Sequence, residues 1–214
     1  MLERFPFSER VALLAGLMAL GALADLCLRG RAATRWQEYT FIWFTGLLGC
    51  VVGAATDLIT SSISPDYFTL GKGLSGGEDF ALGVAAFGIR EGLSAGVIAG
   101  ALCLYVSRRK TKFPPLGCSQ LLGLLWMPII CAAGGALLLP LFAGHSDPAR
   151  LALKVDGLLP SAAIPAFLRV WWTHTGLYSG LLAGLFWLIV VVLRRRKAAT
   201  KEGSGTREHK VETA

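Results

Sequence analysis

Residues 39–74 read YTFIWFTGLLGCVVGAATDLITSSISPDYFTLGKGL and set the pattern for the whole chain. The first part, Tyr39 to Ile59, carries a single acid, Asp57, and is long enough to cross the hydrocarbon core of a bilayer. The second part, Asp57 to Leu74, is polar and contains the helix breaker Pro65. A further apolar segment follows it. This alternation predicts an all-α polytopic transmembrane helical bundle.

The composition of the whole chain agrees with a membrane protein. Hydrophobic residues make up 54% of the 214 residues and charged residues only 16%, and the mean hydropathy is +0.57. A chain with this composition is too apolar to be a soluble domain of this size. The formal charge of +7 does not indicate nucleic-acid binding, because the basic residues cluster at the ends of apolar segments and in the tail.

Five apolar runs are candidate spans, at about 11–28, 39–59, 82–106, 118–142 and 168–193. The first is interrupted by Asp25 and is barely long enough to span, so it either crosses the bilayer, lies in the interface or is a cleaved signal peptide. The fourth contains Pro128, which a span tolerates when neighbouring helices bind the freed carbonyl. We therefore expect a transmembrane domain at 1–197 with four to five spans.

The distribution of basic residues predicts the orientation. The 107–115 loop and the segment after Leu193 are basic, which places both on the cytoplasmic side of the membrane. The 198–214 tail is polar and rich in small residues, so we expect it to be disordered. The outer loop at 143–166 has apolar residues spaced among charged ones, which predicts a short helix on the membrane surface.

Within the polar stretch, Ser64 to Leu70 is predicted to form one or two short helical turns. Ser64 precedes Pro65, which fits an N-cap followed by proline at the first helical position, and Asp66 then falls in the first turn. Gly71 is expected to end these turns in a left-handed conformation. The apolar residues of this segment are expected at headgroup depth, as an interfacial anchor: Tyr67, Phe68 and Leu70.

Two motifs resemble those of a family of uncharacterised bacterial multi-span membrane proteins. The first comprises Asp57, Ile59, Thr60, Ile63, Ser64, Pro65, Asp66, Tyr67, Phe68, Thr69, Gly71, Lys72, Gly73 and Leu74. Most members have glutamate where this chain has Asp66. The second is His174 to Gly180, HTGLYSG, similar to a C-terminal His-x-x-x-Tyr motif followed by glycines, in which asparagine often replaces Thr175. The resemblance implies a protein of the bacterial inner membrane with unassigned activity, and it transfers no catalytic residue.

Glycines at four-residue spacing predict close contacts between helices. Small residues allow backbones to approach in lipid, where hydrophobic contrast contributes little. The second span contributes Gly49 and Gly53. The third and the last span carry longer stripes: Gly88, Gly92, Gly96 and Gly100, then Gly176, Gly180 and Gly184.

Ionisable residues inside the spans predict an intramembrane polar cluster. Arg90 and Glu91 lie within the third span and should face protein or water, because a charge in hydrocarbon costs a few kcal/mol. Their expected companions are Asp57, His174 and Tyr178. One interpretation is structural, with Arg90 neutralised by Asp57 or Glu91. The other is a site for a proton, an ion or a small polar solute.

An enzyme is the less favoured alternative. His174 could be combined with Ser179, Asp57 or Tyr178, but no nucleophile motif, HExxH or paired-aspartate motif supports a catalytic set. We expect no cofactor and no metal. Five cysteines lie in or beside apolar runs without CxxC spacing and are expected to be packing residues: 27, 50, 103, 118 and 131. The expected partners are the lipid bilayer and either another membrane protein or a second copy of this chain.

Overall fold

The computed structural model describes residues 6–109, 113–145 and 158–211, and within these ranges it contains helices and connections but no strand. Five helical segments are long and apolar enough to cross a membrane: Phe7–Ala32, Arg35–Ile63, Phe80–Arg108, Cys118–His145 and Ile164–Ala199. The all-α fold is therefore confirmed. The first apolar run is among the five, so the count agrees with the upper of the two expected numbers.

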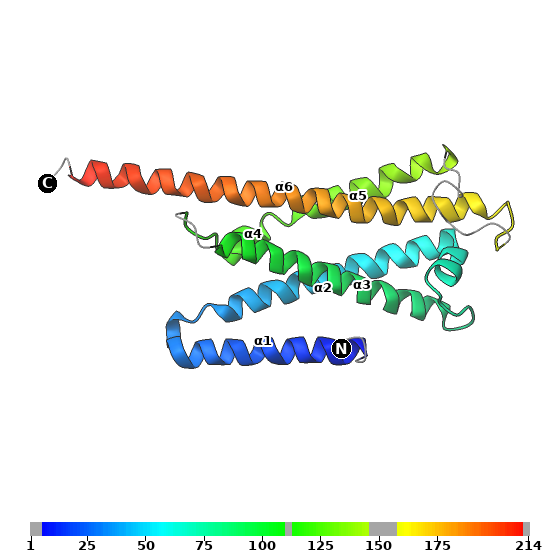
Figure 1. The fold of residues 1–214 in the computed structure, drawn as a ribbon, viewed down its shortest axis with the longest axis horizontal. Helices are drawn as coiled ribbons and strands as arrows, with labels where there is room; N and C mark the ends of the chain where they lie inside the picture. Colours follow the sequence, from blue (N-terminus) through cyan, green and yellow to red (C-terminus); the bar gives the residue numbers. More distant parts are fainter. Residues whose placement is uncertain (1–5, 110–112, 146–157, 212–214) are drawn as a thin grey trace.

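Helix α1 (Phe7–Arg29) lies at one side of the bundle and packs mainly against α2 (Arg35–Ile63). A short 3-10 turn, η2 (Gly30–Ala32), reverses the chain between them (Figure 1). Asp25, on α1, is buried and accepts hydrogen bonds at 3.0 Å from the backbone N–H groups of Thr34 and Arg35. It thereby satisfies donors at the start of α2 that the helix leaves without a partner.

Helices α2 and α3 (Phe80–Arg108) form a hairpin in which their backbones touch. A Cβ atom added at Gly88 would collide with the carbonyl of Gly53, and one at Gly92 with the carbonyl of Gly49. The same holds at Gly96, which faces the backbone of α2 one turn further along. The glycine stripe of the third span thus lies in a close helix contact.

A second hairpin joins α5 (Trp126–Leu138) to α6 (Ile164–Val211), which is the longest helix and lies along one edge of the molecule (Figure 1). Gly176 meets the backbone of Gly135, and Gly180 meets that of Cys131. Gly184 approaches the Cα of Pro128. The two hairpins contact each other less extensively than the helices within each hairpin do.

The fourth apolar run is not a single helix. It is divided into α4 (Cys118–Leu122), α5 and the 3-10 helix η4 (Leu139–His145). The break before Trp126 places Pro128 in the first turn of α5, where its missing N–H removes no hydrogen bond of the helix. The surface helix expected in the outer loop falls largely on residues 146–157, which lie outside the described residues.

The polar stretch after α2 folds inward. A π-helical turn, η3 (Tyr67–Gly71), follows Ser64, whose backbone is extended. The helical backbone begins at Pro65, as predicted, and continues into η3, but the hydroxyl of Ser64 is buried without a hydrogen-bond partner and does not cap it. The left-handed residue is Gly73, with φ +68°, and not Gly71, because the π-turn extends through Gly71.

The last helix is longer than its apolar run. The composition predicts disorder from residue 198, whereas α6 continues to Val211 in the structure. No proline follows Pro165 in this helix, so no residue interrupts the backbone hydrogen bonds. The five cysteines are free thiols, and Cys103 is buried in the apolar core.

Candidate functional site

His174 of α6 lies against the last turns of α2 and is 2% exposed. Its Nε2 is 3.2 Å from the Oγ1 of Thr60 and 3.7 Å from the Oδ1 of Asp57, which are also buried. The hydroxyl of Thr60 donates to the carbonyl of Thr56 at 2.8 Å, so it accepts from His174. This arrangement assigns the ring proton to Nε2.

The other ring nitrogen of His174 has no partner among the described residues. Nδ1 is buried and makes no hydrogen bond. The hydroxyl of Ser64 is likewise buried without a hydrogen-bond partner. With the proton on Nε2, Nδ1 is an unused acceptor in the interior of the protein. Unpaired buried polar atoms are uncommon in folded proteins, and each one needs an explanation.

Aromatic side chains from η3 enclose the imidazole of His174. The ring of Tyr67 stacks on it, with centroids 4.9 Å apart and planes inclined by 15°. Phe68 contacts it edge-on at 6.0 Å and is 0% exposed. Both residues are therefore part of the core, and the expectation of an interfacial anchor was wrong for them. Burial raises the pKa of Tyr67 to about 12.

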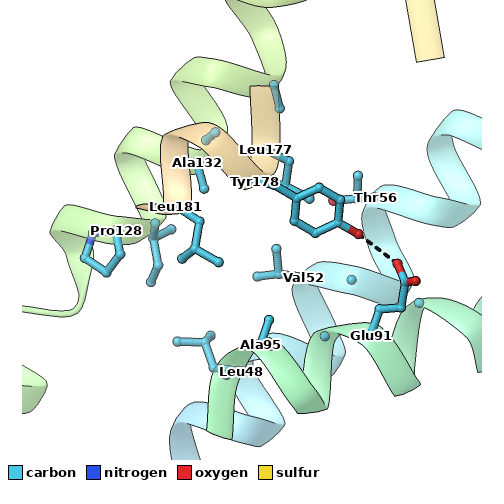
Figure 2. A pocket seen from close by; sticks show the side chains of 18 of the residues that line it. Leu48, Val52, Thr56, Glu91, Ala95, Pro128, Ala132, Leu177, Tyr178 and Leu181 are labelled. Atoms are coloured by element: carbon cyan, nitrogen blue, oxygen red, sulfur yellow. Dashed lines mark hydrogen bonds between the residues drawn. The ribbon is translucent and has the colours of Figure 1, made fainter. Parts of the chain in front are cut away.

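Glu91 of α3 is the centre of a second set of contacts. The hydroxyl of Tyr178 donates to Glu91 Oε2 at 2.7 Å, and Nζ of Lys72 lies 3.3 Å from both carboxylate oxygens. Figure 2 shows the Tyr178–Glu91 hydrogen bond at the side of a cavity. These contacts connect α3, α6 and the segment after η3.

Arg90 does not make the ion pair that the sequence analysis expected. Its guanidinium carbon, Cζ, lies 5.1 Å from the centroid of the Phe87 ring. In the part of the chain that the structure describes, Arg90 forms an ion pair with neither Asp57 nor Glu91. Adjacent residues on a helix point about 100° apart, so Glu91 can face α6 while Arg90 faces elsewhere. The cation beside Glu91 is Lys72, the only basic residue in the 57–74 stretch.

A cavity of 490 Å³ lies between the two hairpins (Figure 2). Of the residues described above, those that line it are Asp57, Thr60, Glu91 and Tyr178. Most of its lining is aliphatic or small, as at Leu48, Val52, Ala95 and Leu181. Its polar side chains are Thr45, Thr56, Asp57, Thr60, Glu91, Thr173 and Tyr178. The volume lies in the range of pockets that hold small molecules.

Ser179 and the possible metal ligands were the other candidates for chemistry. Ser179 donates to the carbonyl of Gly176 at 3.3 Å within its own helix and does not reach His174. Among the described residues, no group of three His, Cys, Asp or Glu side chains could hold a metal ion.

Two buried charged side chains make contacts that the sequence analysis did not predict. One is Asp25, at the start of α2. The other is Arg196, which is 2% exposed and donates at 2.8–3.0 Å to the carbonyls of Val106, Arg109, Phe113 and Pro114. The run Arg194 to Lys197 reads as a topology signal, and nothing in it distinguishes the one arginine that turns inward.

Comparison of the chain with protein-family models, with curated proteins and with solved structures finds no match.

Proposed function

We propose that this chain is a structural or accessory subunit of a bacterial cell membrane, in which a polar cluster between helices fixes their relative positions. The single observation that carries the proposal is the set of contacts at Glu91. Its carboxylate receives Lys72 from the segment after η3 and the hydroxyl of Tyr178 from α6. One side chain thereby joins both hairpins.

The cluster at His174 supports the same role. Asp57 and Thr60 of α2 meet His174 of α6, and Tyr67 covers the ring. Polar contacts of this kind are specific in direction and register, which glycine contacts alone are not. Together they position the second hairpin on the first across an interface that is otherwise only lightly packed.

A double-mutant cycle at Lys72 and Glu91 tests the structural role. The pair is 19% and 34% exposed, between a surface pair and a buried one, so Lys72→Met should cost about 1–3 kcal/mol of unfolding free energy. Adding Glu91→Gln should cost less than the sum of the two single changes. The matched control combines Arg90→Met with Glu91→Gln and should be additive. Additive effects at Lys72 and Glu91 would refute the role.

A second candidate function is movement of a proton, an ion or a small polar solute through the same layer. The observation that favours it is the unpaired Nδ1 of His174, whose other ring nitrogen, Nε2, lies 3.7 Å from Asp57, a residue that lines the cavity. Buried ionisable groups in membrane proteins often lie on such paths.

Proton flux in liposomes separates the two functions. For a structural subunit, liposomes containing the protein should dissipate a pH gradient no faster than empty ones. Flux that disappears in Asp57→Asn but persists in Glu38→Gln, an acid that does not line the cavity, would replace the structural proposal with the second candidate.

The proposed orientation places the C-terminus in the cytoplasm, on the basis of the basic segments. Single cysteines at 75 and 146 should react with an impermeant maleimide from outside, and those at 110 and 203 should not. Reaction at 110 in intact cells would reverse the orientation.

A further inference from the structure

A second cavity lies beside the first. Its lining is mostly polar and charged, whereas that of the first is mostly aliphatic. This cleft has a volume of 530 Å³ and is lined by Phe7 and Arg10 of α1, by Arg90, Glu91 and Ser94 of α3, and by Tyr178 of α6. Arg10 and Arg90 form no ion pair with any residue that the structure describes. Glu91 is the acid in the lining, and Lys72 already compensates its charge. The cleft is therefore cationic.

The two cavities are adjacent. Glu91 and Tyr178 line both of them, so the hydrogen bond between these side chains lies where the cavities meet. On one side are two arginines, and on the other is the mainly aliphatic cavity shown in Figure 2. A ligand that uses both must be anionic at one end and apolar at the other.

The position of Arg10 indicates the depth of the cleft. The apolar run of α1 begins immediately after it, at Val11, so Arg10 lies at the polar edge of that span. Because Arg90 lines the same cleft, its guanidinium is within reach of the headgroup region, where a long basic side chain extends towards phosphates. Along α2, the apolar cavity extends from Thr45 to Thr60, about 22 Å. That length exceeds the half-thickness of a bilayer core, about 15 Å, so the cavity is long enough for a hydrocarbon chain that runs from the headgroup region towards the bilayer centre.

We propose that this chain binds one anionic membrane lipid, with its phosphate between Arg10 and Arg90 and one hydrocarbon chain in the cavity between the hairpins. Arginine is suited to the phosphate because its guanidinium offers several donors in one plane. The hydrocarbon chain would fill a volume that close-packed protein interiors do not leave empty. This goes beyond the structural role, because it assigns a ligand to the cavity and not only a set of helix contacts.

Equilibrium binding to the purified protein in a zwitterionic detergent tests the proposal. The probes are fluorescently labelled phosphatidylglycerol, phosphatidylcholine and inorganic phosphate. Phosphatidylglycerol should bind more tightly than phosphatidylcholine. Arg10→Gln and Arg90→Gln should each weaken it about fivefold, the value of one basic residue near anionic lipid. Arg31→Gln, an exposed arginine outside the cleft, is the matched control and should have no effect.

The apolar part is tested separately by Ala95→Phe, which places a large side chain in the cavity and should also weaken phosphatidylglycerol binding. Thermal denaturation of each variant identifies any that fails to fold, and Arg10→Gln, exposed on α1, then remains as the informative change. Equal loss with Arg31→Gln would overturn the proposal, as would unchanged binding in Arg10→Gln. Competition by inorganic phosphate with no effect of Ala95→Phe would instead indicate a site for a free anion.

Discussion

Replacing Gly92 by alanine should force α2 and α3 apart. The added Cβ would lie 2.6 Å from the carbonyl carbon of Gly49 and 3.1 Å from the backbone nitrogen of Cys50, and it would also collide with the Gly49 carbonyl oxygen. These are backbone atoms of a helix, so no side chain can rotate to make room. Since carbon atoms pack at about 3.5 Å, the helices would have to separate by about 1 Å.

The cost follows from the contacts that this shift affects. Overpacking of a close interface costs about 1–3 kcal/mol. Alanine recovers up to about 1 kcal/mol through its higher helix propensity. The separation also loosens the neighbouring contact between Gly53 and Gly88. We therefore expect a net loss of stability, with a shift in Tm of about 2–4 °C for each kcal/mol.

Gly83 offers a control within the same helix. A Cβ added there meets no heavy atom within 4 Å, so Gly83→Ala should leave Tm unchanged or raise it. Thermal denaturation in detergent, followed by circular dichroism, compares the two variants with the parent. If Gly92→Ala melts at the parent's temperature, the α2–α3 backbone contact does not contribute to stability and the reasoning fails.

Three further changes test other parts of the structure. Arg196→Met should cost about 3 kcal/mol or more, because it removes a buried charged donor from several backbone carbonyls, and Arg196→Lys should recover part of this; equal melting temperatures for all three proteins would contradict the assignment. Asp25→Ala should cost about 1–2 kcal/mol by leaving two N–H groups at the start of α2 without an acceptor, as measured by chemical denaturation. The pKa of Tyr67 is raised from 10.0 to about 12, so its contribution to stability is complete below pH 10 and is lost as pH rises towards 12; denaturation at a series of pH values should show this loss in the parent and a smaller one in Tyr67→Phe.

The positions of Tyr67 and Lys72 show what the sequence could not determine. Aromatic residues beside a span are typical of the headgroup region, and the sequence interpretation placed Tyr67 there. In the structure, η3 turns inward and stacks Tyr67 on His174, more than a hundred residues away in the chain. Lys72 likewise reaches Glu91 only because η3 brings it back over α3. No local pattern encodes either approach.

Properties that each segment carries by itself were determined by the sequence. The five apolar runs correspond, in the part of the chain that the structure describes, to five helical segments long and apolar enough to span a bilayer, because length and hydropathy depend only on the residues in each run. The glycine stripes lie in helix contacts for the same reason, since a missing side chain permits close approach from any neighbour. The tertiary structure decided the partners: Lys72 rather than Arg90 for Glu91, and Arg196 rather than its neighbours for the carbonyls at and beyond the end of α3. Those choices depend on how helices distant in sequence are rotated and crossed, and they arise only when the whole bundle packs.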